Sequence, residues 1–292
     1  MLFSGSMTAI ITPFRDGRVD EDALRKLVDW QISQGTDAIV PCGTTGEAVT
    51  ITYEEQDRIV RIVVEQAAGR VPVLAGAGSN STANAIKLAK QCKAAGADGQ
   101  LQVTPYYNKP TQEGLFQHFR AITEVVDLPM VLYNVPGRTA VNMLPETTSR
   151  LASIDTIIGI KEACGNLEQI KRIIADTPKE FAVFSGDDAM NFDIYRAGGR
   201  GAISVTSNVA PARVAAVWDA FNGGRVEEAQ RLHEGLSVLN KAMFIETNPI
   251  PAKTALAMMG RCREEFRLPM TAMGEEHRAE LKSILESNGL LT

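Results

Sequence analysis

The amino-acid sequence predicts an α/β protein, specifically a (β/α)8 TIM barrel with a C-terminal helical appendage. Short apolar runs of strand length alternate with helix-like stretches eight times along the chain. Beyond about residue 225 the pattern changes to helices alone. We therefore expect a catalytic barrel over residues 1–224 and a helical region over residues 225–292.

Successive apolar runs lie roughly 30 residues apart, which leaves room for one helix between neighbouring strands. Strands connected by helices run parallel. Eight such units close into a barrel more readily than they form an open doubly wound sheet, and no convincing G-x-G-x-x-G follows the first run. The runs are "MTAII", "DAIVP", "VPVLAG", "GQLQV", "PMVLY", "TIIGIK", "FAVFS" and "GAISV".

The segments between the runs carry helix start and stop signals. Residues 19–35 open with acidic side chains, residues 81–96 open at the cap Ser81, and both segments end at a glycine. Residues 248–260 and 273–289 have helical patterns without a strand between them. We expect the first two to cover the barrel and the last two to form the appendage.

The composition argues against several classes of protein. A net charge of -5 provides no basic face for nucleic acid, and no long apolar stretch suggests a membrane span. The N-terminal "MLFSGSMTAIITPF" lacks the features of a targeting segment, so we expect a cytoplasmic protein. The four cysteines form no Cys-x-x-Cys pair and the three histidines lie in helix-like stretches. We therefore expect neither a metal nor an organic cofactor.

Polar and glycine-rich loops follow the predicted strands. Barrels of this kind carry their chemistry at the C-terminal ends of the strands, so these loops indicate where the site lies. The loops include "GTTGE", "TPYYNKP", "YNVPGR", "KEACGN" and "SGDD".

The sixth run, "TIIGIK", ends on Lys161, although its other residues are typical of a buried strand. Side chains alternate along a strand, so Ile157, Gly159 and Lys161 are predicted to face the barrel interior. Ile158 and Ile160 are then predicted to face the helices. Lys161 is thereby placed at the mouth of the barrel.

The preceding run ends on Tyr133, with Val131 predicted to face the interior below it. Neighbouring parallel strands lie about 4.8 Å apart, so the Lys161 amine and the Tyr133 phenol should meet at the mouth. A lysine attacks a carbonyl only when neutral, and burial lowers its pKa from about 10.4. Two other interpretations stay open: an ion pair with Asp187 or Asp188, and a lysine that reaches solvent.

The loop "PCGTTGEAV" suggests an anion-binding turn. Gly43 and Gly46 permit a tight turn whose backbone N–H groups approach a carboxylate, and Thr44 and Thr45 add hydroxyls. An ordinary glycine-rich turn is the alternative. Together with Lys161, the turn suggests a keto acid whose carboxylate lies in the turn and whose carbonyl lies at the lysine.

Six motifs in order resemble the family of 4-hydroxy-tetrahydrodipicolinate synthases, formerly dihydrodipicolinate synthases, within the pyruvate-dependent aldolases and lyases. The resemblance extends over essentially the whole chain. The motifs are "GTTGE", "TPYYNKP", "YNVPGRT", "GIKEA", "SGDD" and "NPIPAK".

The resemblance implies roles for individual residues and a cofactor-free reaction. Pyruvate would form a Schiff base, attack L-aspartate 4-semialdehyde in an aldol step, and leave the enzyme as a cyclic product. The implied catalytic residues are Lys161 for the Schiff base, Tyr133 for proton transfer, Thr44 as a relay, and Tyr107 from a neighbouring subunit. The implied substrate-binding residues are Thr45, Arg138, Ile203 through its carbonyl, and Gly186.

Alternative activities stay open at this stage. Arg138 suits a second carboxylate, whereas a lyase that releases pyruvate from a 2-keto-3-deoxy sugar acid or N-acetylneuraminate must recognise hydroxyls. A metal-dependent hydrolase would use the "SGDD" acids. A noncatalytic sensor would keep the turn without needing Lys161.

The resemblance also bears on assembly and regulation. A Tyr107 contributed across an interface implies a homo-oligomer, and the family suggests a tetramer built as a dimer of dimers. The positions that match the lysine-binding site of inhibited members are Val49, Tyr53, Gln56, Asn80, Asn84 and Tyr106. Inhibited members of the enterobacterial type typically have histidines at the positions of Tyr53 and Gln56 and a glutamate at the position of Asn84. We therefore expect weak feedback inhibition by lysine.

Cys42 and Cys164 adjoin motif residues, and they are either thiols that affect activity or simple packing residues.

Overall fold

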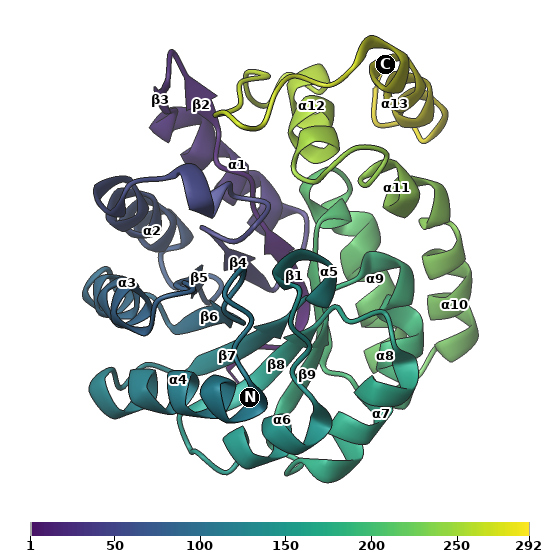
Figure 1. Cartoon of the computed structure of the whole chain (residues 1–292). Helices are drawn as coiled ribbons and strands as arrows, with labels where there is room; N and C mark the ends of the chain where they lie inside the picture. Colours follow the sequence, from purple (N-terminus) through teal and green to yellow (C-terminus); the bar gives the residue numbers. More distant parts are fainter. Residues whose placement is uncertain (1, 292) are drawn as a thin grey trace.

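A computed structural model describes residues 2–291 and shows eight parallel strands surrounded by helices (Figure 1). The strands pair in the order β4-β1-β10-β9-β8-β7-β6-β5. A parallel bridge between Ile39 and Val73 joins the two ends of this sheet and closes the barrel. The predicted fold is thereby confirmed. The strands are β1 (Gly5–Ala9), β4 (Ala38–Val40), β5 (Leu74–Gly76), β6 (Gly99–Val103), β7 (Met130–Asn134), β8 (Ile157–Glu162), β9 (Ala182–Ser185) and β10 (Gly201–Ser204).

Helices follow the strands and cover the outside of the barrel. Side chains cap several of them, since Asp20, Thr52, Ser81 and Thr111 each accept a backbone N–H of the first turn. The Ser81 cap was predicted from the sequence. The helices are α1 (Glu21–Ser33), α2 (Tyr53–Ala67), α3 (Thr82–Ala94), α4 (Gln112–Val125), α5 (Pro136–Thr139), α6 (Pro145–Leu151), α7 (Leu167–Asp176), α8 (Asn191–Ala197) and α9 (Pro211–Asn222).

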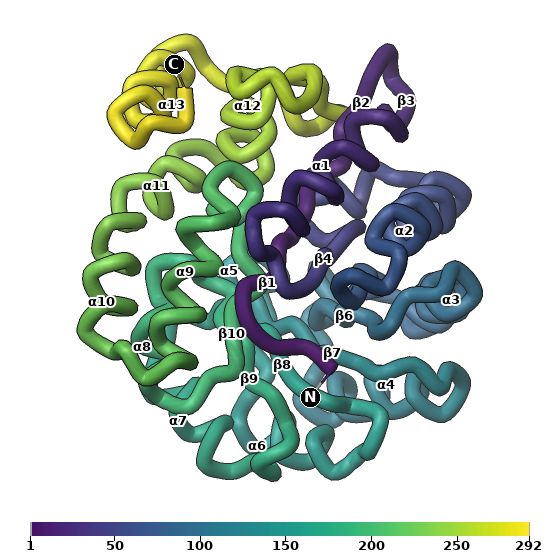
Figure 2. Tube along the Cα trace, turned by 180° about the vertical axis from the view of Figure 1, so that it is seen from behind, coloured from purple at the N-terminus to yellow at the C-terminus, as the bar shows by residue number. Residues whose placement is uncertain are grey.

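Four further helices follow the barrel, as the sequence predicted. In Figure 2, α10 and α11 lie outside α8 and α9, and α12 and α13 lie at the top of the molecule. The described chain contains no helix with the length and apolar character of a membrane span. The four helices are α10 (Val226–Glu234), α11 (Ser237–Ala242), α12 (Ile250–Met258) and α13 (Glu275–Ser287).

A short hairpin that the sequence analysis did not predict follows the first strand. It pairs β2 (Phe14–Arg15) with β3 (Arg18–Val19). The N–H groups of Asp16 and Gly17 at its tip donate to the carboxylate of Glu265. The hairpin thus attaches the beginning of the chain to the segment between α12 and α13, at the top of Figure 1.

The barrel interior departs from strict alternation on β8. Ile157 packs in the layer between strands and helices, and Ile158 packs with the residues inside the barrel, so the prediction for these two was wrong. The cause is an irregularity in register, because Met130 pairs with Ile157 whereas Val131 pairs with Gly159. Ile160 faces the helix layer, as predicted.

Candidate active site

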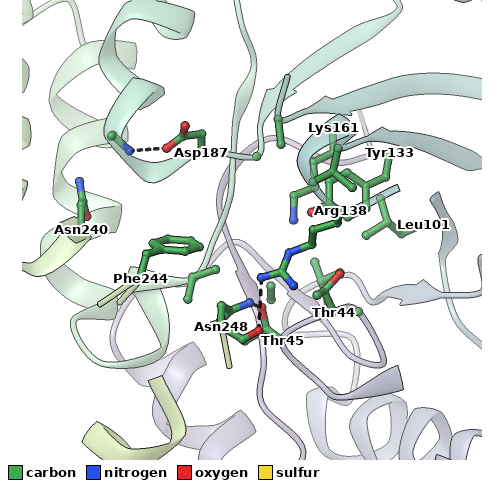
Figure 3. A pocket seen from close by; sticks show the side chains of 18 of the residues that line it. Thr44, Thr45, Leu101, Tyr133, Arg138, Lys161, Asp187, Asn240, Phe244 and Asn248 are labelled. Atoms are coloured by element: carbon green, nitrogen blue, oxygen red, sulfur yellow. Dashed lines mark hydrogen bonds between the residues drawn. The ribbon is translucent and has the colours of Figure 1, made fainter. Parts of the chain in front are cut away.

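A cavity of about 360 Å³ opens at the C-terminal ends of the strands, where the sequence predicted the site. Figure 3 shows Lys161, Tyr133 and Arg138 on one side of it and Asp187, Asn240 and Phe244 on the other. Six of the eight predicted site residues line the cavity, namely Thr44, Thr45, Tyr133, Arg138, Lys161 and Gly186.

Lys161 and Tyr133 occupy paired positions on β8 and β7. The Lys161 Nζ atom lies 4.3 Å from the centroid of the Tyr133 ring, and both side chains are buried. The two residues therefore meet at the mouth of the barrel, which confirms the placement inferred from alternation.

The environment of Lys161 increases the neutral fraction of its amine. Burial lowers its pKa to about 8, and the positive charge of Arg138 acts in the same direction, while Asp188 opposes both. Within the described chain no carboxylate forms a salt bridge with Lys161, and Asp188 accepts the N–H groups of Val205 and Thr206 at 2.8 and 2.9 Å. The ion-pair and solvent-exposed interpretations of Lys161 are therefore wrong.

Gly186 determines the space available to Lys161. A Cβ atom at position 186 would lie 3.0 Å from both Cγ and Cε of Lys161 and 2.9 Å from the Cβ of Ala163. Gly186 follows β9, so the lysine stem packs against the backbone of the next strand. The sequence analysis assigned Gly186 to substrate binding, and the structure adds a contact with the lysine itself.

The turn from Gly43 to Glu47 follows β4. The N–H groups of Gly46 and Glu47 donate to the carbonyls of Gly43 and Thr44, at 3.1 and 3.0 Å. Among the described residues, the N–H groups of Thr44 and Thr45 have no hydrogen-bond acceptor. The turn therefore presents two adjacent backbone donors beside two threonine side chains at the cavity, which suits a carboxylate.

The Tyr133 phenol is buried, and burial raises its pKa. The positive charge of Arg138 and the adjacent Thr44 side chain act in the opposite direction. A phenol that keeps its proton at neutral pH can donate it to a developing oxyanion and accept it back afterwards.

Asn248 was not assigned a role from the sequence, although it begins the motif "NPIPAK". Its side-chain amide donates to Thr45 Oγ1 at 3.1 Å, and its backbone carbonyl accepts from Arg138 at 3.3 Å. Asn248 thus connects the anion-binding turn to the arginine. The motif was the signal that could have identified it.

The C-terminal helical region supplies a further part of the cavity wall. Asn240 and Lys241 of α11 line the cavity together with Phe244. Asn240 and Phe244 lie on the side opposite Lys161 (Figure 3). The sequence analysis treated this region as an appendage and did not expect it at the site.

Two predicted site residues lie apart from this cavity. Ile203 packs inside the barrel on β10, outside the cavity wall. Tyr107 is 90% exposed and has a φ of 75° in the loop after β6. The roles that the resemblance implies for Ile203 and Tyr107 therefore stay predictions.

A second buried carboxylate lies next to Lys161 in sequence. The Asn134 amide and the Cys164 N–H both donate to Glu162. Burial raises the pKa of Glu162 to about 7.

The two cysteines beside motif residues have raised pKa values. Burial, together with the nearby Glu162, raises the pKa of the Cys164 thiol to about 12, and burial raises the pKa of the Cys42 thiol well above its usual range.

Comparison with known proteins agrees with this geometry. The sequence model of the dihydrodipicolinate synthetase family matches residues 2–288. The chain belongs to this family. It is 54% identical over 290 residues to the 4-hydroxy-tetrahydrodipicolinate synthase of Pelobacter propionicus, and the alignment covers 99% of this chain and 100% of the relative.

Solved structures of dihydrodipicolinate synthases have the same fold over the whole chain. A chloride-inhibited synthase from Acinetobacter baumannii, complexed with pyruvate, superimposes with a TM-score of 0.97 at 45% identity and covers 99% of both chains. A synthase described as the first monomeric variant gives a TM-score of 0.98 at 45% identity, covering 99% of this chain and 98% of that one. These similarities favour the predicted synthase over the sugar-acid lyase.

Proposed function

We propose that the protein condenses pyruvate with L-aspartate 4-semialdehyde and releases 4-hydroxy-tetrahydrodipicolinate, in the synthesis of diaminopimelate and lysine. The observation that carries this proposal is the buried Lys161, whose lowered pKa and contact with Tyr133 suit Schiff-base chemistry. The pyruvate complex of the Acinetobacter relative supports the choice of keto acid.

The reaction begins at Lys161. Its neutral amine adds to the carbonyl carbon of pyruvate, and loss of water leaves an iminium ion. The N–H groups and hydroxyls of Thr44 and Thr45 hold the pyruvate carboxylate. Tyr133 donates a proton to the departing hydroxyl and accepts protons in the later steps.

The carbon–carbon bond forms next. The iminium loses a methyl proton to become an enamine, whose carbon attacks the aldehyde of the second substrate. Arg138, which is permanently charged, binds the carboxylate of that substrate. The substrate amine then adds to the iminium carbon and expels the Lys161 amine, which closes the ring and restores the enzyme.

The same proposal covers Ile203, Tyr107 and assembly. The Ile203 carbonyl helps to orient the bound keto acid, and Tyr107 completes the site of a neighbouring subunit in a cytoplasmic homotetramer. The exposed tyrosine, held in a left-handed conformation, is consistent with a residue that contacts a partner chain. Because one relative is a monomeric variant, the oligomeric state of this protein requires its own measurement by sedimentation.

Two measurements test the proposed function. The first is turnover of pyruvate with L-aspartate 4-semialdehyde, coupled to a dipicolinate-ring reductase and followed by NADPH consumption. The second is borohydride trapping of pyruvate, with mass spectrometry to identify the modified residue. We expect Lys161→Ala to abolish both signals and Lys171→Ala, on the exposed face of α7, to leave both unchanged.

The outcomes separate the possible errors. Trapping at Lys161 without turnover would retain the Schiff base and overturn the second substrate. A wild-type protein that folds but traps no pyruvate would overturn the proposal as a whole.

A further inference from the structure

A buried ion pair lies directly behind the anion-binding turn. Glu47 is the last residue of the turn, Lys253 lies on α12, and their side chains are 2% and 0% exposed. The Lys253 ammonium donates to the Glu47 carboxylate and, at 3.0 Å, to the carbonyl of Glu265. It also lies 4.2 Å from the ring centroid of Phe14. Both residues belong to quoted motifs, "GTTGE" and "NPIPAK", yet both lie outside the cavity wall.

Glu47 has a backbone conformation that requires outside support. Its φ of 56° and ψ of 36° lie in the left-handed region, which a residue with a side chain seldom adopts. Its carboxylate accepts from Lys253 and, at 3.2 Å, from the N–H of Arg267. Its own N–H donates to the Thr44 carbonyl, so movement of Glu47 would be transmitted to Thr44.

In addition to the Arg267 N–H, three side chains hold the turn, and they leave its N–H and O–H donors free. Asn248 donates to Thr45, Thr12 donates to the Gly46 carbonyl at 2.7 Å, and Lys253 donates to Glu47. Asn248 and Lys253 belong to one short segment at the start of α12. The C-terminal region therefore fixes the turn at two of the three points.

The energetics of such a pair favour a geometric role. A buried ion pair adds little stability relative to an apolar pair of similar volume, because both charges lose their hydration. Removing one partner, in contrast, leaves a buried charge without compensation. The hydrogen bonds of an ion pair are directional, so they hold the two side chains in one position. Two apolar side chains would be held less tightly.

We propose that Glu47 and Lys253 are positioning residues that hold the Thr44–Thr45 turn in the shape that binds the carboxylate of the 2-oxo acid. This inference rests on the proposed function, because it takes the turn to be the carboxylate site. It assigns the C-terminal helical region a part in pyruvate binding, in addition to its part in the cavity wall.

The test compares Glu47→Gln, Lys253→Met and the double variant Glu47→Met/Lys253→Met. The readouts are the pyruvate concentration for half-maximal borohydride trapping at Lys161, the KM values of both substrates, and the melting temperature. We expect each variant to need roughly tenfold more pyruvate, the effect of a weakened hydrogen bond to a charged group, while the KM of the semialdehyde stays within about twofold.

The double variant separates positioning from stability. It contains no uncompensated charge, so it should regain the melting temperature lost in Lys253→Met but keep the weak binding of pyruvate. A double variant that traps pyruvate at the wild-type concentration would overturn the inference. Equal increases in both KM values would also contradict it, because they would indicate general damage to the site.

A matched control lies in the same region. Lys282 and Glu286 form an exposed ion pair within α13. Lys282→Met/Glu286→Gln should leave pyruvate trapping unchanged. The wild-type protein separates the two proposals: failure of wild-type trapping overturns the proposed function, whereas normal trapping by the wild type and all variants overturns only this inference.

Discussion

The side-chain amide of Asn134 donates to both carboxylate oxygens of Glu162, at 2.9 and 3.2 Å. The two residues are paired in register at the ends of β7 and β8, directly after the paired Tyr133 and Lys161. One pair faces the barrel interior, and the other, by alternation, faces the surrounding layer. The Asn134–Glu162 contact therefore links the two strands directly beside Tyr133 and Lys161, the proposed catalytic pair.

Glu162 should make the stability of the protein depend on pH. Burial raises its pKa from 4.5 to about 7, although hydrogen bonds from Cys164 and Asn134 act in the opposite direction. As the pH rises, the carboxyl group therefore loses its proton in the unfolded chain before it does so in the folded protein. The free energy of unfolding should fall by on the order of 3 kcal/mol between about pH 4.5 and about pH 7. Glu162→Gln cannot ionise and should escape this loss.

Melting temperatures measured from about pH 5 to about pH 8 check this expectation. Relative to the wild type, Glu162→Gln should gain stability as the pH rises. Glu168→Gln, which removes an exposed carboxylate on α7, provides the control. A difference between Glu162→Gln and wild type that stays constant with pH would contradict the assignment.

The rate of Schiff-base formation should follow the titration of Lys161. Because burial lowers its pKa to about 8, trapping of pyruvate should increase with pH and reach half its maximum near that value. Arg138→Gln removes a positive charge that contributes to the lowered pKa, so the profile should move to higher pH. An unchanged profile in that variant would show that Arg138 does not act on Lys161 electrostatically.

Gly186→Ala should reduce turnover without unfolding the protein. The added methyl group would lie 3.0 Å from the stem of Lys161 and displace the amine from the bound keto acid. We expect a loss of roughly 100-fold in kcat, as for a catalytic group misplaced by about 1 Å. Gly137→Ala, where an added Cβ meets no atom within 4 Å, should retain full activity.

Subunit mixing tests whether Tyr107 acts across an interface. Tyr107→Phe and Lys161→Ala should each be impaired as pure oligomers. A mixed oligomer contains sites that combine an intact Lys161 from one chain with an intact Tyr107 from the other, so activity should recover on reassembly. No recovery in verified mixed oligomers would place Tyr107 outside the neighbouring site.

Feedback inhibition by lysine should be weak. The amide of Gln56 already donates to the Gly76 carbonyl at 2.6 Å, and the Tyr53 ring already holds the Lys87 ammonium 3.9 Å from its centroid. Asn84 supplies no negative charge to a bound ammonium. Titration of turnover with lysine checks this, and half-inhibition at sub-millimolar lysine would contradict it.

Side-chain patterns were sufficient to predict the barrel and the core of the site. The spacing of apolar runs identified all eight strands, and alternation placed Lys161 beside Tyr133. Alternation failed at Ile157 and Ile158 because the irregular pairing with β7 arises from backbone hydrogen bonding, which the identity of two isoleucines does not reveal.

Other features depended on contacts distant in sequence. Asn248 reaches Thr45 across 203 positions, and no local pattern specifies such a contact. The hairpin at Phe14–Val19 did carry a local signal, the Asp16-Gly17 turn, but its strands are only two residues long. The division at residue 225 stays a prediction, although α11 and α12 contribute directly to the site.

The junction between β4 and β5 has a consequence for solubility. The N–H of Gly76 donates to the Pro41 carbonyl at 2.9 Å, and a Cβ at Gly76 would lie only 2.0 Å from the carbonyl oxygen of Cys42. Only a glycine permits this approach, which completes the ring through Ile39 and Val73. A barrel without this junction would expose β4 and β5 as free edges, and free edges recruit strands from other molecules. The short junction below the anion-binding turn therefore also protects the protein against edge-to-edge aggregation.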